Sequence, residues 1–207
     1  MIEAVLADNP DYIPAHCTRG EILAALNLRW DAIREYKRII ELDPSEHDLL
    51  HRYASKKLID EYEFLILRHP TNYRIHFELG HAYKDLGIAY SDRTYFSKAR
   101  DQFKKAIEKD GSKIEYHLEL GETFLHLNNA DAALFEMERC LQIEPESIGA
   151  HCALGEIYLQ AGDRELAQKQ FTAIKRILAA QQRAAEEEAQ REKQAAQDAA
   201  KPSRAKK

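Results

Sequence analysis

The sequence contains few of the residues that end helices and form turns. Its 207 residues include only 8 glycines and 6 prolines, whereas a β-sandwich needs turn residues at short, regular intervals. Its apolar runs are short, such as residues 64–67, and a bilayer span needs about 20 apolar residues. Residues 1–10 lack the basic start and apolar core of a secretory signal. These absences predict an all-helical, cytoplasmic protein with no membrane insertion.

Cysteine is also scarce. Cys17, Cys140 and Cys152 are widely separated and form no Cys-x-x-Cys pair, so we expect small buried side chains and no disulfide framework. The net charge is −5, and residues 178–207 hold seven Lys/Arg and five Asp/Glu, which leaves −7 on the remainder. An acidic body argues against nucleic acid as a partner.

The glycines and prolines that are present recur with a fixed period. Pro10 and Pro44 are 34 residues apart, as are Gly121 and Gly155. Twelve residues after such a glycine comes an alanine, and four residues later a large apolar side chain. The copies are Gly20, Ala32 and Tyr36; Gly121, Ala133 and Met137; and Gly155, Ala167 and Phe171. A period of this length indicates a repeat protein.

These positions resemble the tetratricopeptide repeat family over about residues 1–178. The resemblance implies an all-α fold, a right-handed α-solenoid of antiparallel helix pairs. Glycine in the middle of a helix costs about 1 kcal/mol relative to alanine, a cost that is tolerated where a neighbouring helix must approach closely. We therefore expect Ala32, Ala99, Ala133 and Ala167 to be the matching small residues on the second helices.

The resemblance divides the chain into a half repeat, five repeats and a tail. The boundaries are 1–10 for the half repeat, about 11–44, 45–70, 71–111, 112–145 and 146–178 for the repeats, and 179–207 for the tail. The second repeat is short, because Pro44 and Pro70 are only 26 residues apart. Its first helix is then little more than two turns, or both of its helices fuse into one. The third repeat gains seven residues between Gly80 and Ala99, which predicts longer helices or a larger loop.

The tail is rich in Ala, Gln, Glu and Arg. This composition favours a helix but provides no apolar seam for a true coiled coil. We expect an extended charged helix in solvent, ending in a disordered basic tip. The alternative is that this tip contacts an acidic partner; its basic residues are Lys201, Arg204, Lys206 and Lys207.

Two histidine patterns could suggest metal chemistry. His47 and His51 are four residues apart, as in a zinc protease helix, but Asp48 replaces the glutamate general base and no third ligand is evident. The other pattern places a histidine four residues before each mid-helix glycine, at His16, His76, His117 and His151. Successive helix layers are about 10 Å apart, so these rings cannot share a metal, and we expect packed, hydrogen-bonded side chains. We predict no catalytic residue, no metal site and no cofactor.

The resemblance implies a partner-binding groove lined by the first helices. Carried over residue by residue, it comprises Cys17, Glu21, Ala24, Phe77, His81, Lys84, Leu118, Glu122, Leu125, Cys152, Glu156 and Leu159. Cys17 and Glu21 replace the Lys and Asn that begin the chaperone-tail clamp of some family members. Since glutamates remain, we expect a basic and apolar peptide or amphipathic helix as partner. The alternative is that these glutamates are only solvated surface.

A second candidate surface lies at the insertion, where Tyr90, Tyr95 and Phe96 come close together. Insertions in repeat proteins often carry binding, although the rings could instead pack the lengthened helix ends. The basic residues that follow, up to Lys109, indicate a solvated helix face more than a nucleic-acid surface.

Three functions therefore remain open from the sequence. The first is a scaffold or adaptor that binds protein partners within a larger assembly. The second is a homo-oligomer built by head-to-tail contact between repeats. The least favoured is a metal-dependent hydrolase that uses His47 and His51.

Overall fold

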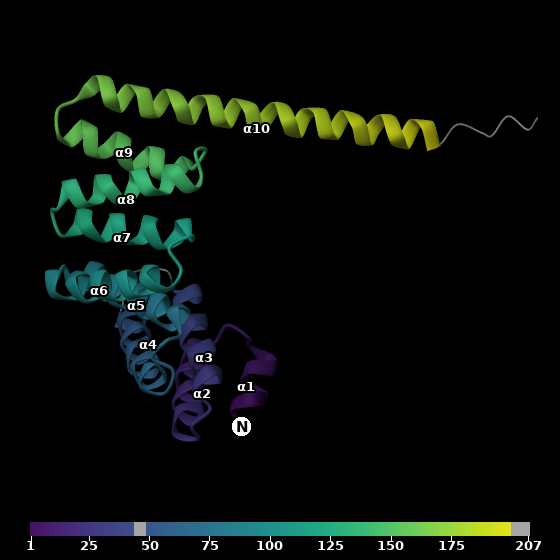
Figure 1. The fold of residues 1–207 in the computed structure, drawn as a ribbon. Coiled ribbons are helices and arrows are strands. Elements are labelled where there is room, and N and C mark those ends of the chain that lie inside the picture. The colour runs from purple at the N-terminus through teal and green to yellow at the C-terminus, as the bar shows by residue number, and fades with distance from the viewer. Residues whose placement is uncertain (44–48, 200–207) are drawn as a thin grey trace, which may run out of the picture. The chain divides into compact units, whose positions relative to one another are not determined.

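The computed structural model describes residues 1–43 and 49–199, and these residues form helices and no strand (Figure 1). The all-α class is thereby confirmed. The helices are α1 (Ile2–Asp8), α2 (Ile13–Ala25), α3 (Arg29–Leu42), α4 (Leu49–Arg68), α5 (Tyr73–Tyr90), α6 (Arg93–Lys109), α7 (Ile114–His126), α8 (Ala130–Ile143), α9 (Ile148–Gln160) and α10 (Arg164–Ala199).

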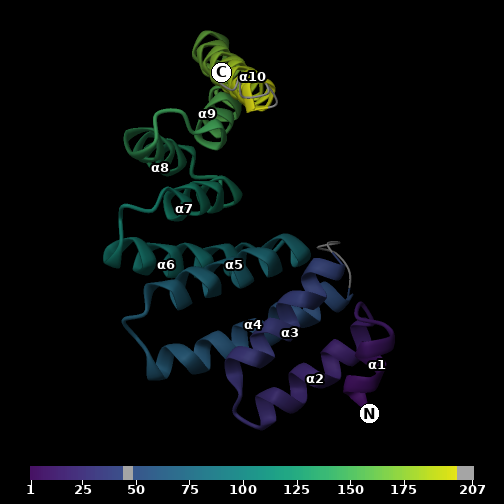
Figure 2. The same cartoon turned by 90° about the vertical axis from the view of Figure 1, so that its right-hand side faces the viewer.

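The chain forms two compact units, Met1–Ile143 and Glu144–Lys207. In the first unit, packing follows chain order: α2 lies against α3, α3 against α4, and so on to α8, with a further contact between α5 and α7 (Figure 2). In the second unit, α9 packs against the first part of α10. Among the described helices, none has both the length and the apolar content needed to cross a membrane.

The mid-helix glycines allow the two helices of each pair to approach closely. A Cβ atom on Gly20 would lie 2.6 Å from the Tyr36 ring, and one on Gly80 would lie 2.5 Å from the Phe103 ring. Gly121 meets Met137, and Gly155 meets Phe171, in the same way. The matching alanines are buried, as predicted: Ala32, Ala99, Ala133 and Ala167.

The predicted histidine contacts are also confirmed, and each ring joins three segments. The Nδ1 atom meets a side chain of the second helix, and Nε2 meets the backbone carbonyl six residues earlier. The Nδ1 partners are Glu35 for His16 (2.8 Å), Gln102 for His76 (2.8 Å), Glu136 for His117 (2.6 Å) and Gln170 for His151 (2.7 Å). The carbonyls belong to Pro10, Pro70, Gly111 and Pro145. These bridges fix the loop before each first helix to the helix pair.

The turns between paired helices use left-handed backbone at corresponding positions. Asn27 and Asn128 have φ of 61° and 56°, and Gly162 has φ of 81°; each follows its mid-helix glycine by seven residues. Asparagine and glycine are the residues that adopt this conformation most easily. In the lengthened pair the position is taken by Ser91, with φ of 51°.

The irregular repeats differ from the rest as the spacing allowed. In the described part of the second repeat, α4 is one unbroken helix of 20 residues. This agrees with the alternative in which the two helices of that repeat fuse into one. The third repeat uses its extra residues to lengthen both helices, α5 to 18 residues and α6 to 17. Only Ser91 and Asp92 link them, so no larger loop forms.

Candidate functional site

The predicted groove residues of the first unit lie on α2, α5 and α7, but their glutamates already have partners. The Glu21 carboxylate accepts a hydrogen bond from the Tyr53 hydroxyl at 2.8 Å and lies 3.3 Å from Lys57 Nζ. Both partners are on α4. The hydrogen bond from Tyr53, with that from Lys57, holds the pKa of Glu21 below its ordinary value. Glu21 is therefore part of the α2–α4 packing as well as of the surface.

Lys84 plays the corresponding role between α5 and α7. Its ammonium contacts the carboxylates of Glu119 and Glu122, the latter at 2.9 Å. Burial disfavours the charged form of Lys84, but attraction and hydrogen bonds to the two carboxylates outweigh it and raise its pKa. Glu119 also lies 3.7 Å from His81 Nδ1. The network joins the first helices of two successive pairs.

Beside this network, aromatic side chains of α5 and α7 line a cavity. The rings of Phe77 and Tyr116 are 4.3 Å apart, and those of Tyr73 and Tyr116 are 6.4 Å apart. The cavity beside them has a volume of about 310 Å³, and Lys113 and Glu115 lie at its edge. Of the predicted groove residues, Phe77 lines this cavity. The other groove positions of the first unit, Cys17, Ala24, Leu118 and Leu125, are half-buried.

In the second unit, the predicted groove residues lie on α9. Cys152, Glu156 and Leu159 are exposed, so Cys152 is not the buried side chain expected from the sequence. Cys140 of the first unit is buried as expected, and burial raises the pKa of its thiol to about 12. Cys17 is intermediate between the two.

The insertion aromatics divide between packing and surface. Phe96 is buried, stacked at 4.4 Å on His126 and seated against Gly87. Tyr95 lies between the rings of Tyr83 and Tyr90, with centroid distances of 6.4 Å and 6.0 Å. Tyr90 is about half exposed. Packing thus accounts for Phe96, and Tyr90 is the most exposed of the three.

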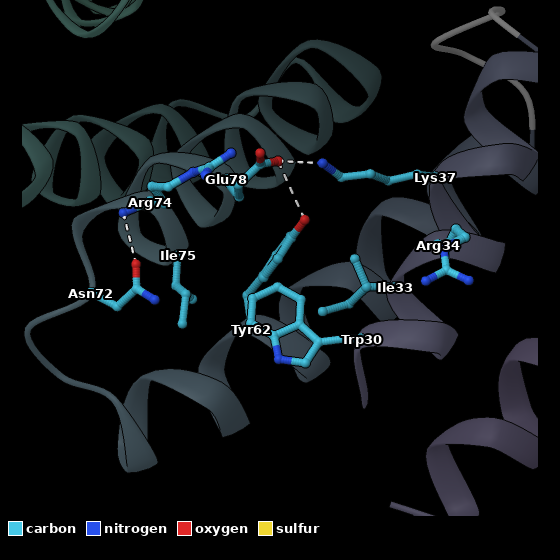
Figure 3. Close-up of a pocket in the computed structure, with 9 residues that line it drawn as sticks. All are labelled: Trp30, Ile33, Arg34, Lys37, Tyr62, Asn72, Arg74, Ile75 and Glu78. Carbon is cyan, nitrogen blue, oxygen red and sulfur yellow. Dashed lines mark hydrogen bonds and ion pairs between the residues drawn. The ribbon is translucent and has the colours of Figure 1, made fainter. Parts of the chain in front are cut away.

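A second groove lies between α3 and α5, and His81 is the predicted groove residue that lines it. Figure 3 shows its larger part, a cavity of about 460 Å³ with Tyr62 of α4 at its base and Trp30 of α3 at its rim. Lys37 reaches from α3 to Glu78 of α5, and the Tyr62 hydroxyl donates to the same carboxylate at 3.3 Å. A second cavity of about 260 Å³ continues beyond this contact, lined by Leu58. The sequence signals for this groove were the short spacing of the second repeat and the prediction of His81 as a groove residue.

The structure supports no metal centre in the part of the chain that it describes, since no group of three potential ligands occurs there. His51 is buried and its Nδ1 lies 3.3 Å from the Asp43 carbonyl oxygen. His47 and Asp48 lie outside the described residues.

Comparison with known proteins agrees with this geometry. Residues 114–147, which span α7, α8 and the following turn, match the model of the tetratricopeptide repeat. Residues 114–147 are thus similar to one tetratricopeptide repeat. This segment includes Gly121, Ala133 and Met137, the residues that make the close approach between α7 and α8.

Among curated proteins, the chain is 29% identical over 87 residues to anaphase-promoting complex subunit 3 of Schizosaccharomyces pombe. The match covers 42% of this chain and only 13% of that protein. The chain therefore spans about an eighth of the length of this relative.

Several solved structures share the fold at low sequence identity. MamA of Desulfovibrio magneticus RS-1, from residue 41 to its end, is 12% identical, with a TM-score of 0.56 and coverage of 82% of this chain and 96% of that one. YrrB, described as a TPR protein with an unusual peptide-binding site, is 17% identical, with a TM-score of 0.54 and coverage of 86% and 92%. At such identities the likeness establishes the helical solenoid fold alone.

Proposed function

We propose that this protein is a scaffold that binds peptide or helical segments of partner proteins along its first helices. The observation that carries the proposal is the aromatic cavity between α5 and α7, where Tyr73, Phe77 and Tyr116 lie beside an open space of about 310 Å³. Concave, aromatic-lined sites with a few polar groups at the edge suit peptide side chains. YrrB, which shares the fold, has a peptide-binding site.

The charge of the surface favours a partner with basic and apolar side chains. Glu21 and Glu122 are each about half exposed, although both have lysine partners within the protein. Exposed ion pairs contribute only about 0–1 kcal/mol, so a partner's lysine or arginine can share or replace such a contact. Glu156 provides the corresponding exposed carboxylate in the second unit.

Charge reversal tests the proposal. The triple variant Glu21→Lys, Glu122→Lys and Glu156→Lys should lose most of the partner proteins that the immobilised wild type captures from its native cell, as measured by mass spectrometry. Lys84 retains Glu119 in this variant, so folding should be preserved and circular dichroism should be unchanged.

A matched control reverses three exposed glutamates on second helices. Glu108, Glu138 and Glu165 lie on α6, α8 and α10, and their replacement by lysine gives the same change in net charge. The control should capture the same partners as the wild type. Equal capture by the two triple variants would contradict the groove assignment. If the wild type captures chiefly itself and its mass rises with concentration in light scattering, self-assembly replaces the scaffold.

A further inference from the structure

The groove between α3 and α5 exists because the repeat array has one helix where a pair is usual. Both α3 and α5 pack against α4, and α4 is a single helix of 20 residues. In the part of the chain that the structure describes, no second helix lies between the faces of α3 and α5 above α4. Figure 3 shows Tyr62 between Ile75 and Ile33, with Trp30 below Tyr62 in this view.

The base and walls of this groove are apolar. Leu58 and Tyr62 of α4 are 4% and 1% exposed, and Ile33 and Ile75 of the walls are 5% and 1% exposed. Trp30 differs, because 54% of its surface remains exposed. A half-exposed tryptophan beside a cavity of about 460 Å³ is typical of the residues that contribute most to binding energy at interfaces.

Arginines line one end of the groove, and acidic residues line the other end. Arg34 and Arg74 line the cavity at the Trp30 end, and Glu41 and Asp85 line the cavity at the other end. Arg34 also lies 3.2 Å from Asp31, and Arg38 lies 2.9 Å from Glu41. Both are exposed contacts three residues apart on one helix, and such pairs hold their partners weakly.

The helix directions add to this polarity. The first turns of α3 and α5 lie together at the Trp30 end, since Trp30 and Asn72 line the same cavity. The amino-terminal ends of helices carry partial positive charge. A bound helix that runs antiparallel to α3 and α5 would place its negative carboxyl-terminal end there, beside Arg34 and Arg74.

We propose that this groove binds one amphipathic helix of a partner protein, antiparallel to α3 and α5, with an acidic carboxyl-terminal turn and a basic first turn. A large apolar side chain of that helix occupies the cavity beside Trp30. A small residue faces the contact between Lys37 and Glu78, which crosses the groove between the two cavities. From Trp30 to Glu41 the groove extends about 16 Å at 1.5 Å per residue, or about three helical turns.

A helix-locked synthetic peptide of about 14 residues tests the proposal directly. It carries leucines along one face, an alanine at the midpoint of that face, lysines in its first turn and glutamates in its last. Its matched control has the lysines and glutamates exchanged and is otherwise identical. Trp30 is the only tryptophan of the chain, so its emission reports whether the groove is occupied.

The first peptide should shift the emission of Trp30 to shorter wavelength, and the exchanged peptide should bind at least about tenfold more weakly. In anisotropy measurements with labelled peptide, Trp30→Glu and Arg74→Glu should each weaken binding by about tenfold or more. Leu67→Glu, which changes an exposed leucine of α4 outside the groove, should bind as the wild type does.

Three results would overturn the proposal: no binding of either peptide at millimolar concentration, equal binding of both, or binding without a change in Trp30 emission. If instead the emission of Trp30 shifts when the protein alone is concentrated, the occupant is a second copy of this chain. The groove adjoins the surface proposed above, because Arg74 and Glu78 line a cavity of each, but Glu21, Glu122 and Glu156 do not line it. The triple variant at Glu21, Glu122 and Glu156 should therefore bind the first peptide normally.

Discussion

The four histidine bridges differ in the residue that Nδ1 meets. His16 and His117 face glutamates, whereas His76 and His151 face glutamines. An ionised carboxylate at Nδ1 can only accept a hydrogen bond from the ring. A glutamine can instead turn its amide and donate to a neutral ring. The two glutamate bridges therefore place an ionisable carboxylate in a buried contact, whereas the other two place a neutral amide at that position.

Replacement of Glu35 by glutamine should make the free energy of unfolding less dependent on pH. Burial raises the pKa of Glu35, but hydrogen bonds from Arg19 and His16 outweigh this and lower it below the ordinary 4.5. A carboxyl whose pKa is lower in the folded than in the unfolded state stabilises the protein at pH values above its unfolded-state pKa. This contribution is lost as the pH falls through its folded-state pKa. Glu35→Gln should thus cost about 1–2 kcal/mol at pH 7 and markedly less near pH 3.

Urea denaturation at both pH values measures this difference. Glu138→Gln, which changes an exposed glutamate of α8, is the control and should have little effect at either pH. A deficit of equal size at pH 7 and pH 3 would show that Glu35 acts through packing and not through its charge.

The mid-helix glycines should differ in their tolerance of alanine. A Cβ on Gly80 meets the rigid ring of Phe103 at 2.5 Å, whereas a Cβ on Gly121 meets the terminal methyl of Met137, which can rotate away. Alanine gains about 1 kcal/mol in helix propensity, and overpacking of a core costs about 1–3 kcal/mol. We expect Gly80→Ala to destabilise by about 1–2 kcal/mol and Gly121→Ala to be nearly neutral.

Thermal and urea unfolding of the two variants, side by side, check this order. The opposite order, with Gly121→Ala the less stable, would mean that backbone approach and not the opposing side chain sets the cost.

Among the helices, α10 shows the sharpest change in side-chain exposure along its length. Ala167 and Ile177 are buried against the rest of the second unit, but from Leu178 to Lys193 every side chain is exposed. A solvated helix without tertiary contacts is only marginally stable in water. Removal of residues 184–207 should therefore leave the midpoint of thermal unfolding unchanged within about 1 °C, while lowering helical circular dichroism in proportion to the residues lost. A fall of several degrees would show that this part of α10 contacts the protein.

The features that could be predicted from the sequence are those set by local rules. The glycine contacts, the buried alanines and the histidine bridges each depend on residues within one helix pair. Their spacing is the same in three pairs and seven residues longer in the third repeat. The groove between α3 and α5 could not be predicted in this way, because it depends on how these two helices pack around the single helix described for the second repeat. For the same reason, the pairing of Glu21 with Tyr53 and Lys57 depended on α4 lying over α2.

At the scale of the whole molecule, most contacts between helices join helices that are adjacent in the sequence. In the first unit each helix packs mainly on its neighbours in the chain, and in the second unit α9 and α10 pack on each other. The stability of such an array is a sum of local pair energies and interfaces between neighbours. Damage to one pair should therefore remain local, because helices far along the chain share no contacts with it.

A variant in the second unit tests this localisation. Gly155→Val places two methyl groups where even a Cβ lies 2.7 Å from the Phe171 ring, so α9 and the first part of α10 should separate. In hydrogen exchange followed by mass spectrometry, peptides from these helices should lose protection, while peptides from α2, α3, α5 and α6 should exchange as in the wild type. Loss of protection throughout α2–α6 would mean that the two units unfold as one cooperative body, and the additive description of the array would be wrong.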